Sequence, residues 1–253
     1  MKLTNLVSYG EAMPIPCAVQ ALVIDLDGTL VDSADDLRIA LNKVLTELGL
    51  RPIETNEIKS MIGDGVPKLL ERGLIAANGD AAQTDSLLPR FLEIYQANPA
   101  ALTRCYPRVI QTLEALRRED FRLAVVTNKP VVVTKKILDA LSLSKFFAVV
   151  VGGDSVQKRK PDPAPVLEAT RQLGVDVTQA LMVGDNIHDV EAAHSAGMRC
   201  VAVTYGYHHR PPSEFNADYL INHFDELMQL VIKPISNRSE AGTNSEFVSP
   251  LNT

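Results

Sequence analysis

Two aspartates, Asp25 and Asp27, directly follow a short apolar run at residues 21–24 that reads Ala-Leu-Val-Ile. An apolar run without alternation is typical of a parallel strand buried on both faces, and open α/β sheets bind ligands at the carboxyl ends of such strands. Gly28 then allows a sharp turn and a close approach of the backbone to a ligand. Two carboxylates buried side by side are unfavourable unless a cation or a proton accompanies them. The segment therefore predicts a hard divalent cation such as Mg²⁺ beside the two aspartates.

Two more apolar runs are followed by groups that can hold an anion. Thr127 and Asn128 lie at the end of the run at 122–127, and Lys160 comes shortly after the run at 147–151, within Lys-Pro-Asp-Pro. Taken alone, a threonine that ends a strand is more often a helix cap, and a basic loop is more often solvated. Their shared position after predicted strands makes them candidates for the same ligand site.

A second pair of aspartates follows the apolar run at 180–184. Asp185 comes directly after this run, and Asp189 lies four residues later, in the first turn of a predicted helix. Side chains four residues apart on a helix can face the same spot. The pair can therefore join a metal site, although acidic residues are also favoured at any helix N-terminus.

These motifs resemble those of a known enzyme family. The segment 25–33, DLDGTLVDS, resembles the first motif of the haloacid dehalogenase-like hydrolases, in the phosphatase branch that has a second Asp two residues on. The resemblance implies that Asp25 attacks phosphorus and that Asp27 acts as general acid and base. It also implies a phosphate site and a Mg²⁺ site in one crevice. The phosphate site would comprise Thr127, Asn128 and Lys160, and the Mg²⁺ site Asp25, Asp27, Asp185 and Asp189.

Strand and helix patterns alternate along most of the chain, which predicts an α/β fold with a doubly wound, mostly parallel sheet. The resemblance to the haloacid dehalogenase-like hydrolases implies that this sheet forms a Rossmann-like core. The predicted strands lie at 21–24, 122–127, 147–151, 180–184, 199–203 and 218–221.

Between residues 34 and 104 the sequence has helical periodicity but no convincing strand. A segment of this length is too long for an ordinary crossover, so it predicts an inserted helical domain. The insertion matches the small helical cap that the resemblance implies. We expect a catalytic core at 19–33 and 105–233, an irregular extension at 1–18 and a disordered tail at 234–253.

Bulk composition excludes several classes of partner. The 253 residues carry a formal net charge of −6, which gives no general attraction for nucleic acid or an anionic membrane. The three cysteines are far apart, no segment resembles a signal peptide, and no apolar run is long enough to span a membrane. We therefore expect a cytoplasmic protein that acts on a small phosphorylated metabolite, without nucleic-acid or membrane partners. The sequence leaves open whether it is a monomer or a homodimer.

Three segments are similar to phosphoglycolate phosphatases: the opening motif, the cap segment at 62–72, and Val-Thr-Tyr-Gly-Tyr at 203–207. This similarity implies hydrolysis of 2-phosphoglycolate to glycolate and phosphate. In the cap segment, Lys68 and Arg72 can either bind a substrate carboxylate or form an exposed face with Glu71. The sequence leaves both interpretations open.

Other functions share parts of this pattern. A sugar-phosphate phosphatase or mutase and a pyrophosphatase have the same core motifs. A phosphonoacetaldehyde hydrolase would use a cap lysine, here Lys68, to form a Schiff base. A receiver-like signalling module also clusters acids, Thr and Lys, but it would lack the insertion and the Asp-x-Asp-Gly-Thr turn. For the histidines, we expect His208 and His209 in a solvated loop and His188 in a purely structural role.

Overall fold

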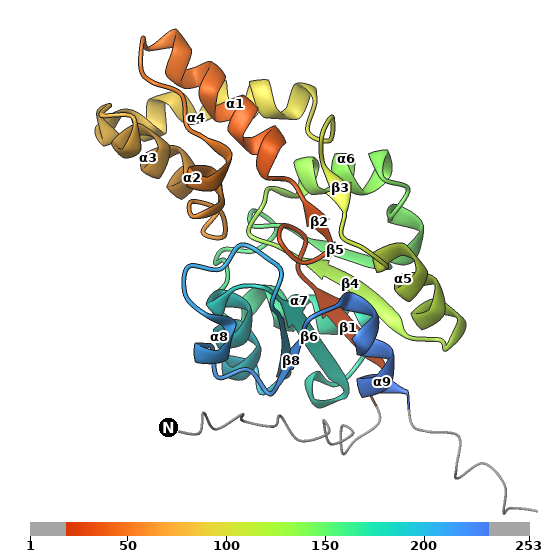
Figure 1. Ribbon diagram of the computed structural model, residues 1–253. Coiled ribbons are helices and arrows are strands. Elements are labelled where there is room, and N and C mark those ends of the chain that lie inside the picture. The colour runs from red at the N-terminus through yellow and green to blue at the C-terminus, as the bar shows by residue number, and fades with distance from the viewer. Residues whose placement is uncertain (1–18, 233–253) are drawn as a thin grey trace, which may run out of the picture.

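The computed structural model of the protein describes residues 19–232, and its central element is a parallel β-sheet (Figure 1). Six strands lie in the order β5-β4-β1-β6-β7-β8, and every neighbouring pair is parallel. The first apolar run forms β1, which lies in the interior of the sheet between β4 and β6. The strands span Ala21–Ile24 (β1), Arg122–Val126 (β4), Val149–Val151 (β5), Ala180–Gly184 (β6), Arg199–Val203 (β7) and Tyr219–Ile221 (β8).

Helices cover both faces of this sheet, because alternate residues of a strand point to opposite faces. Leu22 and Ile24 of β1 belong to one apolar cluster, which includes side chains of α5, α6 and α9. Ala21 and Val23 belong to another, which includes side chains of α7 and α8. The prediction of a doubly wound α/β fold is therefore confirmed. These helices span Val109–Arg118 (α5), Val131–Ala140 (α6), Ala164–Leu173 (α7), Ile187–Ser195 (α8) and Leu227–Val231 (α9).

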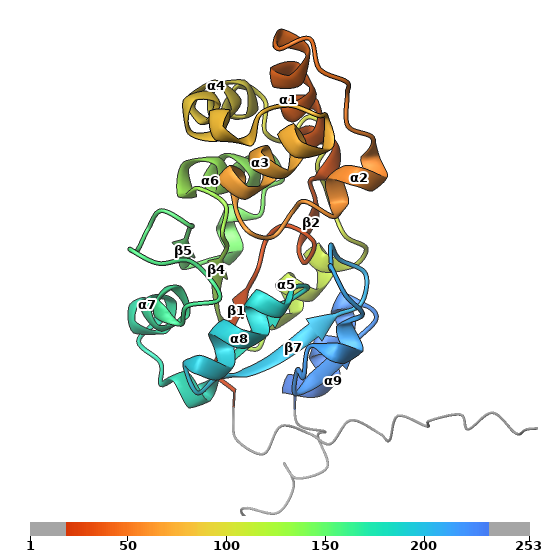
Figure 2. The ribbon, with the colours of Figure 1, turned by 90° about the vertical axis from the view of Figure 1, so that its left-hand side faces the viewer.

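Four helices between the first strand and the rest of the sheet form a group of their own (Figure 2). Helix α1 packs against α2, α3 and α4, and α3 packs against α4. The largest fully buried side chains of this group are Phe91 and Tyr95 of α4. The predicted helical insertion is thus present. Its helices span Ala34–Glu47 (α1), Thr55–Lys59 (α2), Val66–Ala76 (α3) and Thr84–Ala97 (α4).

A short antiparallel ribbon joins the insertion to the core, and the sequence did not predict it. Strand β2 (Val31–Asp32) pairs with β3 (Arg104–Cys105), so the chain enters and leaves the insertion at one place. Asp36, at the start of α1, also connects the beginning of the insertion to its end. Its carboxylate accepts hydrogen bonds from the backbone N–H of Leu102 at 3.0 Å and of Thr103 at 2.7 Å. Strands of two residues carry too little pattern to be recognised in a sequence.

Short 3₁₀ segments complete the described structure, and within residues 19–232 no helix combines the length and apolarity needed to cross a bilayer. The predicted irregular extension at 1–18 and the predicted tail at 234–253 lie outside the described residues. The 3₁₀ segments are Ala81–Gln83, Ser144–Phe146, Val177–Gln179, Pro212–Glu214 and Phe224–Glu226.

Candidate active site

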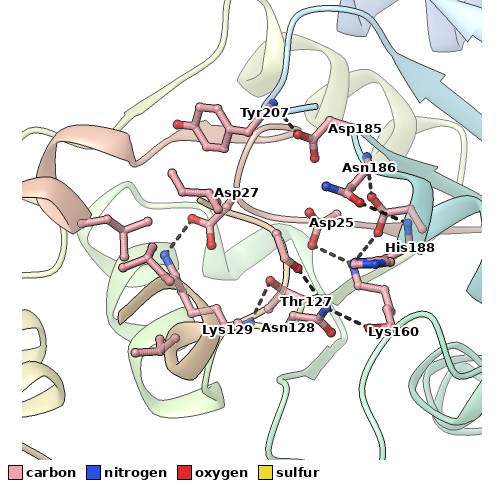
Figure 3. A pocket seen from close by; sticks show the side chains of 17 residues that line it. Asp25, Asp27, Thr127, Asn128, Lys129, Lys160, Asp185, Asn186, His188 and Tyr207 are labelled. Atoms are coloured by element: carbon pink, nitrogen blue, oxygen red, sulfur yellow. Dashed lines mark hydrogen bonds and ion pairs between the residues drawn. The ribbon is translucent and has the colours of Figure 1, made fainter. Parts of the chain in front are cut away.

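One pocket contains all seven residues that the sequence analysis selected (Figure 3). It lies at the carboxyl ends of β1, β4 and β6, where parallel sheets bind ligands. The lining residues from the helical insertion are Leu37, Ile62, Gly63, Gly65, Val66 and Leu69. The selected residues are Asp25, Asp27, Thr127, Asn128, Lys160, Asp185 and Asp189.

Asp25 and Asp185 are brought together by the ends of two paired strands. Asp25 directly follows β1, and its backbone N–H donates a hydrogen bond to Val183 of β6 at 2.9 Å. Gly28 turns the chain away with φ of +86°, and a Cβ atom at this position would lie 2.1 Å from Oδ2 of Asp185. Both the backbone angle and the close approach therefore require glycine here.

Three of the four aspartates form a compact carboxylate cluster. One oxygen each of Asp25, Asp185 and Asp189 lies within 4.8 Å of the others, and all three residues are buried. Asp185 accepts hydrogen bonds from the Thr29 hydroxyl at 3.1 Å and from the Tyr207 backbone N–H at 2.6 Å. The structure does not bring the carboxylate of Asp27 into this cluster.

Lys160 is the cation that faces the cluster. Its ammonium donates hydrogen bonds to Oδ1 of Asp25 at 2.8 Å, to Oδ1 of Asp189 at 2.5 Å and to the Val126 carbonyl at 2.8 Å. Burial acts to lower the Lys160 pKa, but the charges of Asp189 and Asp25 outweigh it, so the pKa is raised and the ammonium stays charged. A single positive charge thus pairs directly with two of the three buried carboxylates.

The electrostatics of the cluster fit a divalent cation. Three carboxylates less one ammonium leave two negative charges uncompensated. Burial raises the pKa of Asp25 to about 7 despite the opposing charge of Lys160. Burial, together with the charges of Asp25 and Asp189, raises the pKa of Asp185 well above its usual range. Carboxylate oxygens are the ligands preferred by hard divalent ions, so the donor set and its charge agree.

Thr127 and Asn128 lie where β4 ends, on the opposite side of Asp25 from Asp185 (Figure 3). Thr127 lines the pocket, and its hydroxyl accepts a hydrogen bond from the Lys129 backbone N–H at 3.3 Å. The Asn128 amide donates to the Gly63 carbonyl of the insertion and to the Lys160 carbonyl, each at 3.0 Å. Asn128 therefore links the insertion to the loop that carries Lys160.

Lys129 is a site residue that the sequence analysis missed. Its side chain is buried, lines the pocket and donates a hydrogen bond to Oδ1 of Asp27 at 2.7 Å. The Ser33 hydroxyl donates to the same oxygen at 2.5 Å. Ser33 stands at the N-cap of α1 but makes no side-chain cap hydrogen bond, and the Tyr207 hydroxyl accepts the backbone N–H groups of Ser33 at 2.8 Å and of Ala34 at 3.1 Å. The sequence signal for Lys129 was its place immediately after Thr127 and Asn128.

The loop before α3 differs from expectation in its histidine contacts. His188 lines the pocket, and its Nδ1 lies 3.2 Å from Oδ1 of Asp64, so this histidine has an ionisable neighbour that its sequence position did not indicate. Its structural role stays a prediction. The loop that carries His208 and His209, predicted to be solvated, also approaches Asp64, since Nε2 of His209 lies 3.9 Å from Oδ2 of Asp64. Burial and the nearby Arg72 guanidinium lower the pKa of His209. Histidines on separate segments give no sequence sign that they meet.

The two basic residues of α3 form ion pairs with nearby acidic residues. Arg72 pairs with Asp64 at 2.5 Å and donates to the Met61 carbonyl at 3.1 Å. Lys68 is exposed, pairs with Glu71 at 2.6 Å and does not belong to the pocket lining. For Lys68, the structure favours the exposed face over a contact with substrate.

The chain belongs to the haloacid dehalogenase-like hydrolases, because the sequence model of that family matches residues 22–203. It is 42% identical to a phosphoglycolate phosphatase of Cereibacter sphaeroides (strain ATCC 17029) over 213 residues, 83% of this chain and 96% of that protein. It is 39% identical to a phosphoglycolate phosphatase of Nitrosospira multiformis over 225 residues, 87% and 99% of the two chains. The crystal structure of a predicted phosphoglycolate phosphatase from Haemophilus somnus matches with a TM-score of 0.80 at 33% identity, covering 85% of this chain and 98% of that one. The resemblance to the family is thereby confirmed.

Proposed function

We propose that the protein is a Mg²⁺-dependent phosphatase that hydrolyses 2-phosphoglycolate to glycolate and phosphate through an aspartyl-phosphate. The observation that carries the proposal is the meeting of Asp25, Lys160 and Thr127 with a carboxylate cluster in one pocket. The substrate is supported by the relatives named phosphoglycolate phosphatase, which align over nearly their whole length. The substrate class is a small phosphorylated metabolite.

The proposed reaction has two steps that exchange bonds at phosphorus. In the first, the Asp25 carboxylate attacks phosphorus and the bond from phosphorus to the ester oxygen breaks, while Asp27 gives a proton to the leaving alkoxide. In the second, Asp27 takes a proton from water, which attacks phosphorus and releases Asp25. The Lys160 ammonium, the Thr127 hydroxyl and the Asn128 backbone N–H bind the phosphate oxygens as charge develops.

Asp25, Asp185 and Asp189 would hold the Mg²⁺ ion. When bound, the ion supplies positive charge for the phosphate and for the carboxylates around it. The sequence analysis also proposed Asp27 as a ligand, and that assignment stays a prediction. The Asp27 carboxylate accepts hydrogen bonds from Lys129 and Ser33.

Adding Mg²⁺ to protein stripped with EDTA should raise its melting temperature, because the ion relieves the repulsion among the three buried carboxylates. Asp185→Asn should strongly reduce this rise, whereas Asp85→Asn, at an exposed position of α4, should keep it. Differential scanning fluorimetry over a Mg²⁺ titration measures both. A full Mg²⁺ response in Asp185→Asn would contradict the proposed ligand set.

The helical insertion is the proposed cap, with residues 34–104 as its bounds and residues 19–33 and 105–233 as the catalytic core. The apolar insertion residues Ile62, Val66 and Leu69 line the pocket and support a role in enclosing the substrate. This arrangement would separate the reaction, carried by the core, from recognition of the leaving group.

The competing functions lack comparable support. A Schiff-base mechanism of the phosphonoacetaldehyde hydrolase type needs a cap lysine at the substrate, and Lys68 is exposed and paired with Glu71. A receiver-like module is opposed by the family match and by the helical insertion. Sugar-phosphate and pyrophosphate substrates are distinguished by experiment.

Phosphate release should be measured over a panel of small phosphorus compounds, with Mg²⁺ and with EDTA. The panel contains 2-phosphoglycolate, hexose and pentose phosphates, pyrophosphate and phosphonoacetaldehyde. We expect kcat/KM to be highest for 2-phosphoglycolate and activity to vanish in EDTA. A higher value for a sugar phosphate or pyrophosphate would replace the proposed substrate, and full activity in EDTA would overturn the Mg²⁺ requirement.

A further inference from the structure

Lys129 carries a buried charge that bridges the core and the insertion. The residue is 4% exposed and belongs to the loop between β4 and α6, which also carries Thr127. Its ammonium donates to Oδ1 of Asp27 at 2.7 Å (Figure 3). It also donates to the Tyr95 hydroxyl at 2.7 Å. Burial acts to lower the Lys129 pKa, but the charge of Asp27 and the hydrogen bonds to Asp27 and Tyr95 outweigh it, so the pKa is raised. The side chain is therefore a permanent cation at this place.

Asp27 presents its two oxygens to different surroundings. Oδ1 accepts both the Lys129 ammonium and the Ser33 hydroxyl. With Oδ1 occupied, proton exchange with a ligand in the pocket falls to Oδ2. The rotation of a carboxylate about its last bond is otherwise loosely constrained, so the two donors fix which oxygen faces the ligand.

Tyr95 supplies the contact from the insertion. It lies in the last turns of α4, is 1% exposed and has its ring 6.0 Å from that of Phe91. The Lys129 ammonium lies 5.0 Å from the centre of the Tyr95 ring, in addition to its bond with the hydroxyl. Because the ring is packed inside the insertion, the position of the hydroxyl follows the position of α4.

We propose that Lys129 is a positioning residue for Asp27 and that Tyr95 sets the place of the Lys129 ammonium, so that Asp27 is aligned only while α4 is seated on the core. The inference rests on the proposed phosphatase function and adds a residue from the insertion to the control of proton transfer. When α4 moves away, Lys129 loses one of its two partners and its hold on Asp27 loosens. Leaving-group protonation and enclosure of the substrate are thereby coupled.

Two substrates of similar size distinguish positioning of the general acid from a general structural role. The glycolate alkoxide that leaves 2-phosphoglycolate requires a proton, whereas the acetate that leaves acetyl phosphate does not. For kcat/KM, which reports the steps up to the first irreversible one, loss of an aligned Asp27 should therefore affect only 2-phosphoglycolate. General damage to the pocket would lower both values together.

The variants are Lys129→Met, Tyr95→Phe and the double substitution, measured with Mg²⁺ present. For 2-phosphoglycolate we expect kcat/KM to fall about 100-fold in Lys129→Met and roughly tenfold in Tyr95→Phe, following the usual size of general acid catalysis. For acetyl phosphate both should stay within about threefold of wild type. In the Lys129→Met background, Tyr95→Phe should add no further loss, since coupled residues are not additive.

Lys136→Met is the matched control, because Lys136 also contacts α4, through the Gln96 carbonyl at 2.9 Å, but does not contact Asp27. It should leave both substrates unchanged. Equal losses for both substrates, or independent losses that multiply in the double variant, would overturn the inference while the phosphatase proposal stands. Should Lys129→Met fail to fold, Tyr95→Phe alone decides, since it keeps the packed ring. A wild-type protein that hydrolyses neither substrate overturns the proposed function and this inference with it.

Discussion

Asp25→Asn should abolish phosphate release and leave the fold intact. The amide has the shape of the carboxylate but is a poor nucleophile, so the aspartyl-phosphate cannot form. We expect kcat to fall by at least about 10⁴-fold, as for other nucleophile substitutions. Because Asp25 is one of three crowded carboxylates, removing its charge should not lower the melting temperature of the metal-free protein.

Asp36→Asn is the control for this substitution, since Asp36 is also a buried aspartate, bonded to Thr103 at the exit of the insertion and outside the pocket. It should lower stability while kcat stays within about threefold of wild type. The measurements are steady-state phosphate release and thermal unfolding of both variants. Turnover of Asp25→Asn above a tenth of the wild-type value would contradict the assignment of the nucleophile.

Lys160→Met should have the second large effect, on stability as well as on activity. Removing one partner of a buried ion pair costs about 3–5 kcal/mol, because the other charge stays buried without compensation. Here the Lys160 ammonium serves both Asp25 and Asp189, so the metal-free variant should lose an amount of this order. Mg²⁺ should restore much of the stability, whereas phosphate release should remain low because the phosphate loses a cation.

Urea unfolding of Lys160→Met in EDTA and in Mg²⁺ measures the two stabilities. Lys158→Met is the matched control from the same loop, since its ion pair with Asp162 is exposed and contributes little. Its free energy of unfolding should change by less than about 0.5 kcal/mol, with activity retained. A free energy of unfolding of metal-free Lys160→Met equal to that of wild type would contradict the prediction that the Lys160 ammonium stabilises the three buried carboxylates.

The sequence predicted the sheet and the pocket residues that follow its strands. The reason is local: each buried strand is a continuous apolar run, and the residues just after it must lie at the same edge of the sheet. Asp25, Thr127 and Asp185 could be selected in this way because β1, β4 and β6 are neighbours in the sheet. The roles assigned to these residues remain predictions until the variants are measured.

Contacts made by the insertion could not be predicted from the sequence. Tyr95 meets Lys129 across 34 positions of the chain, and its spacing along α4 is that of an ordinary buried residue. His188 and Asp64 likewise meet only because α8 and the loop before α3 approach the same pocket. Such pairs depend on how two groups of helices and strands are oriented, which no local pattern records.

The ribbon of β2 and β3 makes the insertion an exchangeable part. Val31 pairs with Cys105 and Asp32 with Arg104, so the chain returns to the point from which it left. The order and register of the six-stranded sheet therefore do not depend on the length of the intervening segment. A segment from a relative that acts on a different ester could replace the one here without moving Asp25, Thr127 or Lys160. Under the coupling proposed above, such a replacement preserves the reaction only if it also supplies the contact that Tyr95 makes here with Lys129.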